Sequence, residues 1–289
     1  MANPMRTLLW VPGNIPEKIA EALECKADCV VLDLEDTVPV AKKSEAREMV
    51  VRTICDARPK DKLIGVRVNS WQSPFGVDDL RAVVRVRPDI VRLPKCGTLE
   101  EMQQVDRLIG TIEKEAGIPE GATRVIVSLE SALGIINAFP IAKATGRLIA
   151  LAIGVEDYTT DMKTVRSTRG LELELLYARS HLVTAARAAG IKAIDGAFLD
   201  ISDEEGLIAE TQLIKQLGFD GKSITHPNQV AIVHKVFAPS DEEVAFAKKV
   251  VKAFIQAEKD GSFYVFVDNK LVDPPVYAKA QRILELSQT

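Results

Sequence analysis

Short runs of apolar, often β-branched residues alternate along this chain with longer segments in which apolar residues recur every three or four positions. Runs of the first kind are typical of buried strands, and segments of the second kind are typical of amphipathic helices. Strong helices are expected at Lys42–Arg58, Leu99–Glu115, Leu171–Ala189 and Glu204–Leu217. Eight strands are expected: Thr7–Val11, Cys29–Leu34, Ile64–Asn69, Ile90–Lys95, Arg124–Glu130, Leu148–Gly154, Lys192–Phe198 and Lys222–Thr225.

Eight strands separated by helices favour an α/β fold, a closed (β/α)8 TIM barrel, over an open doubly wound sheet. No Gly-rich phosphate loop follows the first expected strand, which argues further against a nucleotide-binding sheet. In such a barrel, the residues near the carboxyl ends of the strands form the active site. Charged residues at those ends are therefore the first candidates for chemistry.

Roughly sixty residues follow the eighth strand, more than a closed barrel needs to complete its core. They predict a long helix at Asp241–Glu258, an extended piece with a charged turn at Ser262–Leu271, and a helix opened by Pro274–Pro275. We divide the chain into a catalytic barrel, residues 1–238, and a C-terminal helical extension, residues 239–289. The extension is expected to act as a cap or as an arm that reaches a neighbouring subunit.

Composition narrows the classes of partner. The 289 residues carry a net charge of −4, which gives no electrostatic reason to expect nucleic acid or an anionic membrane as a partner. No apolar run approaches the roughly 20 residues that span a bilayer, and the N-terminus lacks the apolar region of a signal peptide. We expect a cytoplasmic protein whose four cysteines, which form no CxxC pair, are reduced.

Several charged side chains are expected at the mouth of the barrel. Side chains alternate between the two faces of a strand, so the apolar positions show which face meets the helices. In the third strand, residues 64, 66 and 68 are apolar, which turns Arg67 toward the barrel axis. The same reasoning, together with the strand ends, yields four acids and two bases: Asp33, Glu35, Glu130, Asp157, Arg67 and Lys95.

This set leaves a surplus of two negative charges at the mouth. Carboxylates clustered in a partly desolvated site repel one another, and a bound cation relieves that repulsion. The chain has only three histidines, so a zinc site or a histidine-centred triad is poorly supplied. Hard oxygen ligands favour Mg²⁺, or Mn²⁺ as its substitute.

Each of these charges also has a structural interpretation. Glu130 could cap the helix that starts near Leu133, Asp157 could open a turn, and Arg67 could neutralise a structural carboxylate. Charges that converge from several strand ends of one barrel nevertheless favour a functional site.

Four positions receive a simpler interpretation. Lys95 is assigned an electrostatic role, because a metal at the mouth makes a Schiff-base pathway redundant. Lys43 and Arg47, one helical turn apart, are expected on a solvated helix face. Asp273 directly precedes Pro274–Pro275, a pattern typical of a helix N-cap.

Nine ordered segments carry a family likeness that runs from about Arg6 to Leu284. The chain resembles the β subunit of citrate lyase and its relatives, the malyl-CoA and citramalyl-CoA lyases of the HpcH/HpaI aldolase superfamily. The stretch GVEDYTTDMKTVRSTRGLELELLYAR is more similar to the citrate lyase subunit than to malyl-CoA lyases. Asn269 departs from the glycine that relatives usually carry there. The segments are RTLLWVPG, VVLDLEDTVP, VRVN, VRLPK, SLESALGI, GVEDY, GFDGKSITHPNQ, FAPS and KLVDPPV.

The resemblance implies a role for each matched residue. It implies that Glu130 and Asp157 ligate Mg²⁺, that Arg67 holds the substrate carboxylate or the thioester carbonyl, and that Asp273 enters a neighbour's active site as acid and base. Lys95, Glu35 and Asp36 are placed with Arg67 and Glu130 among the substrate-binding residues.

The implied reaction is a retro-Claisen cleavage of a 3-hydroxy-acyl thioester, with CoA or an acyl-carrier protein as the thioester carrier. For a citryl thioester the products are oxaloacetate and an acetyl thioester. A homotrimer or hexamer is expected, with acyl-carrier and transferase subunits as further partners in a citrate lyase complex. Two alternatives stay open: a stand-alone lyase for malyl-CoA or citramalyl-CoA, and a non-catalytic scaffold subunit, against which the charged mouth argues.

Overall fold

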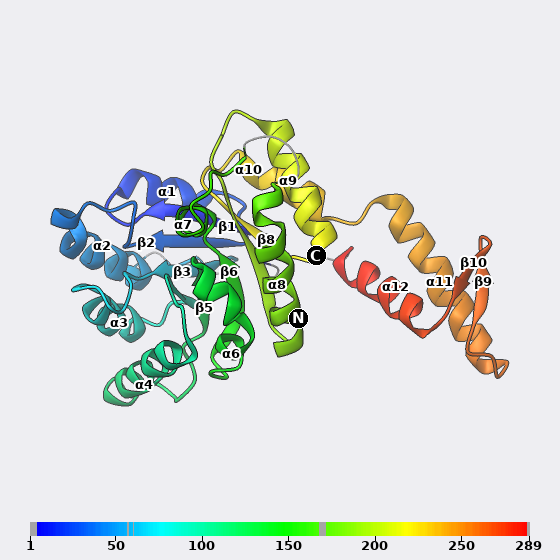
Figure 1. Cartoon of the computed structure of the whole chain (residues 1–289), viewed down its shortest axis with the longest axis horizontal. Coiled ribbons are helices and arrows are strands. Elements are labelled where there is room, and N and C mark those ends of the chain that lie inside the picture. The colour runs from blue at the N-terminus through cyan, green and yellow to red at the C-terminus, as the bar shows by residue number, and fades with distance from the viewer. Residues whose placement is uncertain (1–4, 57, 60, 168–171, 288–289) are drawn as a thin grey trace. The chain divides into compact units, whose positions relative to one another are not determined.

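Eight parallel strands close into a barrel in the computed structural model, which describes residues 5–56, 58–59, 61–167 and 172–287 (Figure 1). The strands follow one another around the barrel in chain order, and β1 closes it by pairing with both β2 and β8. The predicted TIM barrel is therefore confirmed. The strands are β1 Thr7–Pro12, β2 Cys29–Asp33, β3 Leu63–Arg67, β4 Ile90–Leu93, β5 Val125–Leu129, β6 Leu148–Ile153, β7 Lys192–Phe198 and β8 Gly221–Ile224.

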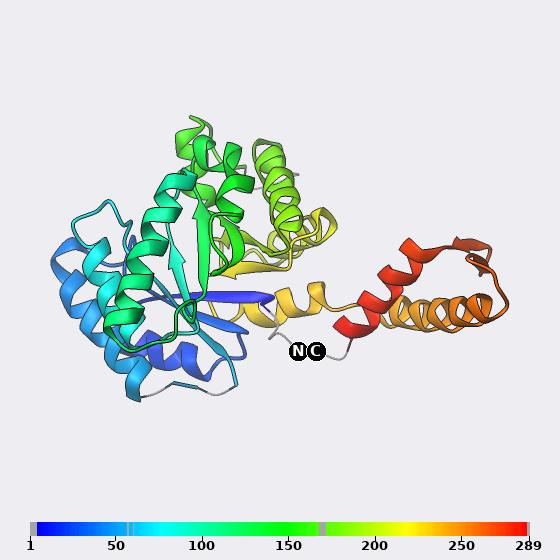
Figure 2. The ribbon, with the colours of Figure 1, turned by 90° about the horizontal axis from the view of Figure 1, so that it is seen from below.

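Helices lie outside the strands of this barrel, as Figure 2 shows for the blue and cyan segments. The predicted helices are found with ends that shift by at most two residues; Leu171, the predicted start of α8, lies outside the described residues. A short 3₁₀ turn, η1 Val40–Lys42, directly precedes α2. The helices are α1 Pro16–Glu24, α2 Lys43–Asp56, α3 Gly76–Arg85, α4 Leu99–Glu115, α5 Ala132–Ile136, α6 Ala138–Ala142, α7 Val155–Asp161, α8 Leu173–Ala189, α9 Glu204–Leu217 and α10 Gln229–Phe237.

The interior of the barrel is apolar along the first part of the strands and polar at their carboxyl ends. Val31 of β2 and Ile126 of β5 belong to a buried apolar cluster inside the barrel. Two residues further along the same strand faces stand Asp33 and Ser128, which are fully buried. The apolar layer supplies the core, so the polar layer above it is available for a site at the carboxyl ends.

The chain divides into two compact units, Met1–His234 and Lys235–Thr289. In the second unit α11 (Asp241–Lys259) packs on α12 (Pro274–Leu286), and Phe254 stacks on Tyr277 with ring centroids 4.7 Å apart. Between these helices lies an antiparallel hairpin of β9 (Val265–Val267) and β10 (Lys270–Val272).

The turn of this hairpin explains one departure from the family pattern. Asp268 and Asn269 adopt φ values of 47° and 61°. Two successive residues with positive φ are typical of a two-residue hairpin turn, which favours glycine and tolerates asparagine. Asn269 can therefore stand where the resemblance leads us to expect glycine, because asparagine also tolerates the backbone conformation of this turn.

Across the part of the chain that the structure describes, no helix combines the length and the apolar character that crossing a membrane requires.

Candidate active site

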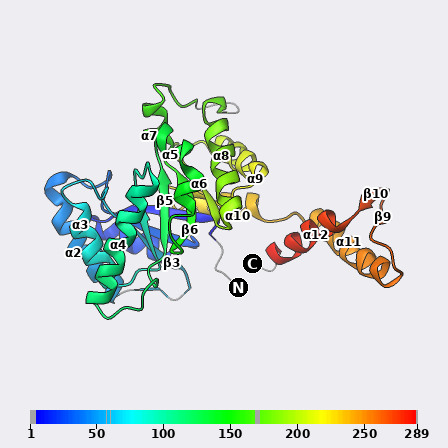
Figure 3. The same cartoon turned by 60° about the horizontal axis from the view of Figure 1, so that its bottom comes forward.

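Four segments bring charged side chains to the carboxyl end of the barrel. Asp33 and Arg67 close β2 and β3, and Glu130 follows β5. Asp157 lies in the first turn of α7, which begins directly after β6. Figure 3 shows α5 and α7 at the same end of the barrel, and a hydrogen bond of 2.7 Å from the backbone N–H of Ala132 to Asp161 joins them.

Asp33 binds Arg67 with both carboxylate oxygens. Arg67 donates from Nε to Oδ1 over 2.6 Å and from Nη2 to Oδ2 over 2.7 Å. Asp33 also accepts hydrogen bonds from the backbone N–H groups of Glu35 and Thr37. Burial opposes ionisation of Asp33, but the hydrogen bonds and charge of Arg67 outweigh it and lower the pKa of this carboxyl group. Asp33 is therefore a charged partner that orients Arg67.

The loop after β2 supplies two further acids. Arg67 Nη1 lies 3.0 Å from Glu35 Oε2 and 3.3 Å from Asp36 Oδ2. Lys95 Nζ lies 3.0 Å from Glu35 Oε1 and 3.3 Å from Asp36 Oδ1. Burial raises the pKa of Glu35 despite these cations. The structure thus brings together Arg67, Lys95, Glu35 and Asp36, as predicted.

Lys95 has a backbone φ of 55°, in the left-handed region that non-glycine residues seldom adopt. Backbone strain of this kind concentrates at ligand-binding sites, where the surrounding structure imposes it.

Glu130 is a strongly perturbed carboxyl group at the mouth. Its side chain is buried, and Oε2 has no hydrogen-bond partner among the described residues. Burial, reinforced by the negative charges of Glu35 and Asp157, raises the pKa of Glu130 to about 8. Such a carboxylate is poorly stabilised by the protein alone, and a cation beside it would supply the missing partner.

A glycine makes room for this carboxylate. A Cβ on Gly154 would lie 2.5 Å from Cγ of Glu130 and 2.7 Å from its Cδ. Gly154 follows the last residue of β6, is the N-cap of α7 and precedes Asp157 by three residues. The absence of a side chain at position 154 therefore lets Glu130 reach over toward the segment that carries Asp157.

The donor set fits a hard divalent cation. Asp157 is exposed, and its charge raises the pKa values of both Glu130 and Lys95. Within the described ranges, no three His, Cys, Asp or Glu side chains gather as a complete ligand set. Mg²⁺ is commonly held by one or two carboxylates, with water and substrate oxygens filling the other positions. Two carboxylates of which one lacks a partner match that pattern, whereas a zinc site would need more protein ligands.

Arg92 is a further charged residue at the mouth that was not among the candidate site residues predicted from the sequence. This residue of β4 is 2% exposed, donates from Nε to Ser128 Oγ over 2.8 Å and from Nη1 to Ser223 Oγ over 3.2 Å. Its guanidinium carbon lies 4.4 Å from the centre of the Trp10 ring, and that of Arg67 lies 4.1 Å from it. The available signal was an arginine at an inward position of an otherwise apolar strand.

Lys43 and Arg47 do not lie on the solvated helix face that the sequence predicted. Lys43 is buried, contrary to the expected solvated face, because Nζ donates to the backbone carbonyls of Leu34 and Glu35 over 2.8 and 2.7 Å. It thereby holds the acidic loop after β2. Arg47 pairs with the fully buried Asp79 at 2.6 Å.

The helix caps resolve two alternatives. Ser131, not Glu130, caps α5 by accepting a hydrogen bond from the backbone N–H of Gly134. Asp273 caps α12 by accepting a hydrogen bond of 3.1 Å from the N–H of Val276. The capping interpretation is thus wrong for Glu130 and confirmed for Asp273.

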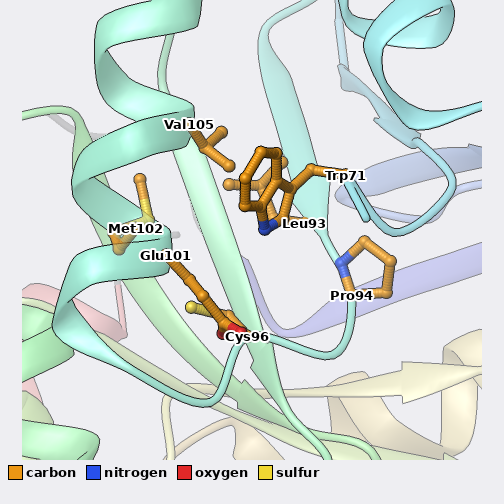
Figure 4. Close-up of a pocket in the computed structure, with 7 residues that line it drawn as sticks. All are labelled: Trp71, Leu93, Pro94, Cys96, Glu101, Met102 and Val105. Carbon is orange, nitrogen blue, oxygen red and sulfur yellow. The ribbon is translucent and has the colours of Figure 1, made fainter. Parts of the chain in front are cut away.

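A small pocket lies near this site but contains none of the predicted residues (Figure 4). It is formed between the loop after β3, the end of β4 and α4. Burial raises the pKa of its Cys96 thiol to about 12, so this cysteine is not a nucleophile at neutral pH. The lining residues are Trp71, Leu93, Pro94, Cys96, Glu101, Met102 and Val105.

Comparisons with known proteins confirm the resemblance. The family model for HpcH/HpaI aldolase/citrate lyase matches residues 6–227. The chain is 44% identical over 282 residues to the citrate lyase subunit beta of Leuconostoc mesenteroides subsp. cremoris, covering 98% of this chain and 93% of that one. It is 33% identical over 296 residues to human mitochondrial citramalyl-CoA lyase, covering 98% and 86%.

A solved structure extends these matches. The citrate lyase beta subunit of Mycobacterium tuberculosis, complexed with oxaloacetate and magnesium, has a TM-score of 0.68 and 29% sequence identity. The match covers 82% of this chain and 98% of that one. The chain, with this group of charged residues at the mouth of its barrel, therefore belongs to the HpcH/HpaI aldolase/citrate lyase family.

Proposed function

We propose that this protein is a Mg²⁺-dependent carbon–carbon lyase that cleaves a citryl thioester into oxaloacetate and an acetyl thioester. The observation that carries the proposal is Glu130, a buried carboxylate with an unpartnered oxygen beside the charge of Asp157. The identity of 44% to a citrate lyase subunit beta favours citryl over other acyl groups.

Glu130 and Asp157 would hold the cation. When bound, Mg²⁺ supplies Lewis acidity to the 3-hydroxyl and the adjacent carboxylate of the substrate, and thereby lowers the pKa of the hydroxyl. Mn²⁺ has similar ligand preferences and is expected to substitute.

The side chains of this chain would carry the remaining steps. The substrate hydroxyl gives its proton to the carboxylate of Asp273 from a neighbouring subunit, which we assign as the base. The hydroxyl oxygen then forms the ketone of oxaloacetate, and the electron pair of the broken C–C bond passes to the acetyl thioester as an enolate. Arg67 would stabilise the developing negative charge with an N–H of its guanidinium. Lys95, which faces Glu35 and Asp36, would add positive charge at the rim.

The enolate carbon then needs a proton, and we assign its delivery to Asp273 of a neighbouring subunit. With this assignment, residues 1–238 would form the catalytic barrel and residues 239–289 an extension that completes another barrel's site. A homotrimer or a hexamer built from trimers would provide the neighbour.

The direct test is cleavage of citryl-CoA, citramalyl-CoA and malyl-CoA, each with Mg²⁺ and with EDTA. We expect citryl-CoA to be cleaved fastest and metal-free protein to be inactive. Full-rate cleavage by metal-free protein would exclude the metal site. A preference for citramalyl-CoA would support the alternative lyase, which the 33% identity to human citramalyl-CoA lyase favours. No cleavage of any substrate, alone or with acyl-carrier and transferase subunits, would support the scaffold alternative.

Shared sites have their own test. Asp273→Ala and Glu130→Ala subunits, each inactive, are mixed under conditions that allow subunit exchange. Some pairings then place an intact Glu130 opposite an intact Asp273, and part of the activity returns. If exchange is demonstrated and no activity returns, Asp273 is an N-cap without a role in turnover. A cytoplasmic location and an acyl-carrier protein as the thioester carrier complete the proposal.

A further inference from the structure

Arg92 is a buried cation without a carboxylate partner. Among the described residues, no Asp or Glu lies within ion-pair distance of its guanidinium, although the side chain is 2% exposed. Its Nε and Nη1 donate hydrogen bonds to the neutral hydroxyls of Ser128 and Ser223. Burial and the charge of Arg67 lower the pKa of Arg92 to about 10, which leaves it charged at neutral pH. A buried charge without a counter-charge is costly, so it marks a place where an anion is expected.

Arg67 makes the contrast clear. Its three guanidinium nitrogens face the carboxylates of Asp33, Glu35 and Asp36, so negative charge already surrounds it. Arg92 stands opposite Arg67 in the register of β3 and β4, and both pack on the ring of Trp10. Of the two arginines, Arg92 is therefore the one whose positive charge has no carboxylate partner among the described residues and is available to an anionic ligand.

The side chain of Arg92 is held in one orientation. Hydroxyls from β5 and β8 accept hydrogen bonds from Nε and Nη1, and Trp10 of β1 supports the plane of the guanidinium. The charge of Glu130 acts on Arg92, so this cation belongs to the same end of the barrel as the proposed metal ligand. A guanidinium fixed in this way is suited to a planar carboxylate.

The identity of the carboxylate that Arg92 binds follows from the chemistry of the substrate, and this step rests on the proposed function. A citryl thioester carries a carboxymethyl arm on the carbon that becomes the ketone, whereas a citramalyl thioester has a methyl group there and a malyl thioester a hydrogen. We propose that Arg92 binds the carboxylate of this arm and selects thioesters whose cleavage yields a dicarboxylic oxo acid. The same contact would reject citramalyl thioesters, because a methyl group leaves the buried cation unpaired.

The test is the ratio of kcat/KM for citryl-CoA to that for citramalyl-CoA. Arg92→Met removes the charge and keeps most of the side-chain length, so it should lower the ratio by about a hundredfold or more, as loss of a buried charged contact does. Arg67→Met is the matched control, because it removes the other arginine on Trp10 and should weaken both substrates without a comparable change in ratio. The proposal is wrong if the ratio is unchanged in Arg92→Met, whether the kcat/KM values for both substrates fall equally or neither of them falls.

A milder variant keeps the test decisive if Arg92→Met does not fold. Ser223→Ala removes the acceptor for Nη1 and leaves the charge in place. The ratio should fall by about tenfold, the value of one hydrogen bond to a charged group. A ratio within twofold of the unmodified protein in folded Ser223→Ala contradicts the assigned contact.

Binding of products separates this inference from the proposed function. Calorimetry with Mg²⁺ present should show tighter binding of oxaloacetate than of pyruvate, and Arg92→Met should abolish that preference. If the unmodified protein cleaves no citryl thioester yet binds oxaloacetate through Arg92, the lyase proposal fails and the carboxylate site stands. If oxaloacetate has no advantage over pyruvate, the carboxylate site fails whatever the outcome for turnover.

Discussion

Two groups of charged side chains in the barrel unit differ in how far the protein neutralises them. The mouth contains Glu130, with an unpartnered oxygen, and Arg92, with no carboxylate partner among the described residues. A second group, which we call the packed cluster, lies between β7, β8 and the helices α8 and α9. It consists of Arg166, Glu172, Arg179, Asp195, Glu210 and Lys222.

In the packed cluster every acid has a base beside it. Arg179 Nε lies 2.8 Å from Asp195 Oδ1, and Lys222 Nζ lies 2.9 Å from Asp195 Oδ2. Burial opposes ionisation of Asp195, but the charges of Arg179 and Lys222 outweigh it and lower the pKa of Asp195. The same balance lowers the pKa of Glu210, next to Lys222 and Arg179.

The degree of neutralisation distinguishes a group of charges that stabilises the fold from a group that is expected to bind a ligand. Both groups are buried, so burial alone does not identify a site. What distinguishes the mouth is incomplete neutralisation, which a metal and an anionic substrate would complete, whereas the packed cluster needs no ligand. Substitutions in the two groups should therefore affect different properties.

The largest expected effect is the loss of turnover in Glu130→Gln. The amide keeps the size of the side chain but removes the charge that would hold Mg²⁺, so kcat should fall by about a thousandfold or more. Thermal unfolding should show an intact fold. Glu210→Gln is the matched control in the packed cluster and should lower Tm while keeping most of the turnover. Equal losses of turnover in both variants would remove the distinction between the two groups.

Arg67→Lys should have the next largest effect. Lysine keeps the charge but cannot bind Asp33 through two parallel hydrogen bonds, so the orientation of the cation is lost. We expect kcat/KM to fall by about a hundredfold, equivalent to about 3 kcal/mol. Steady-state kinetics with citryl-CoA measures it, and near-normal values would return Arg67 to a structural role.

Arg179→Met should change stability rather than chemistry. Removing one member of a buried ion-pair network leaves Asp195 and Glu172 with less compensation, which typically costs about 3–5 kcal/mol. Denaturant unfolding measures this cost, and turnover per folded molecule should stay within a few-fold. Lys42→Met, which removes an exposed pair with Glu45, should cost less than about 1 kcal/mol. A large loss of turnover in folded Arg179→Met would give the packed cluster a functional role.

Gly154→Ala tests the space that Glu130 needs. The added methyl group would collide with Cγ of Glu130 and shift its carboxylate, while the backbone φ of −99° suits alanine. The Mg²⁺ concentration that gives half-maximal activity should rise by about tenfold, a cost of about 1.4 kcal/mol. Gly146→Ala is the control, since a Cβ there meets no atom within 4 Å. Equal Mg²⁺ requirements would contradict the role of Gly154.

The last expected effect concerns the stability of metal-free protein against pH. Because the pKa of Glu130 is raised from 4.5 to about 8, its protonated form favours the folded state. This contribution is fully present below about pH 4.5 and is lost as the pH rises through about 8. The Tm of metal-free protein should therefore decline over this range, and Glu130→Gln should flatten the decline. An identical pH profile in the variant would mean that Glu130 is not the buried group that titrates.

Local patterns were sufficient for the barrel and for part of the mouth. The apolar pattern identified the eight strands because each strand is a short run that is buried almost throughout, whereas each helix buries one face of its sequence. Alternation along a strand then turned Arg67 and Glu130 inward, since the pleat decides that direction without reference to other strands. The N-cap at Asp273 was likewise readable, because a cap depends on three or four consecutive residues.

The pairing of charges was decided only by the tertiary structure. Asp33 binds Arg67 across neighbouring strands, and Lys43 is buried because the loop after β2 folds back over it. Arg92 has no carboxylate partner among the described residues, and β5 and β8 place serines beside it instead. Register between strands and the path of loops determine such contacts, and neither leaves a periodic trace in the sequence. The sequence by itself thus determined most of the charges that reach the mouth, though not Arg92, and the closed barrel decided which of them remain available for a ligand.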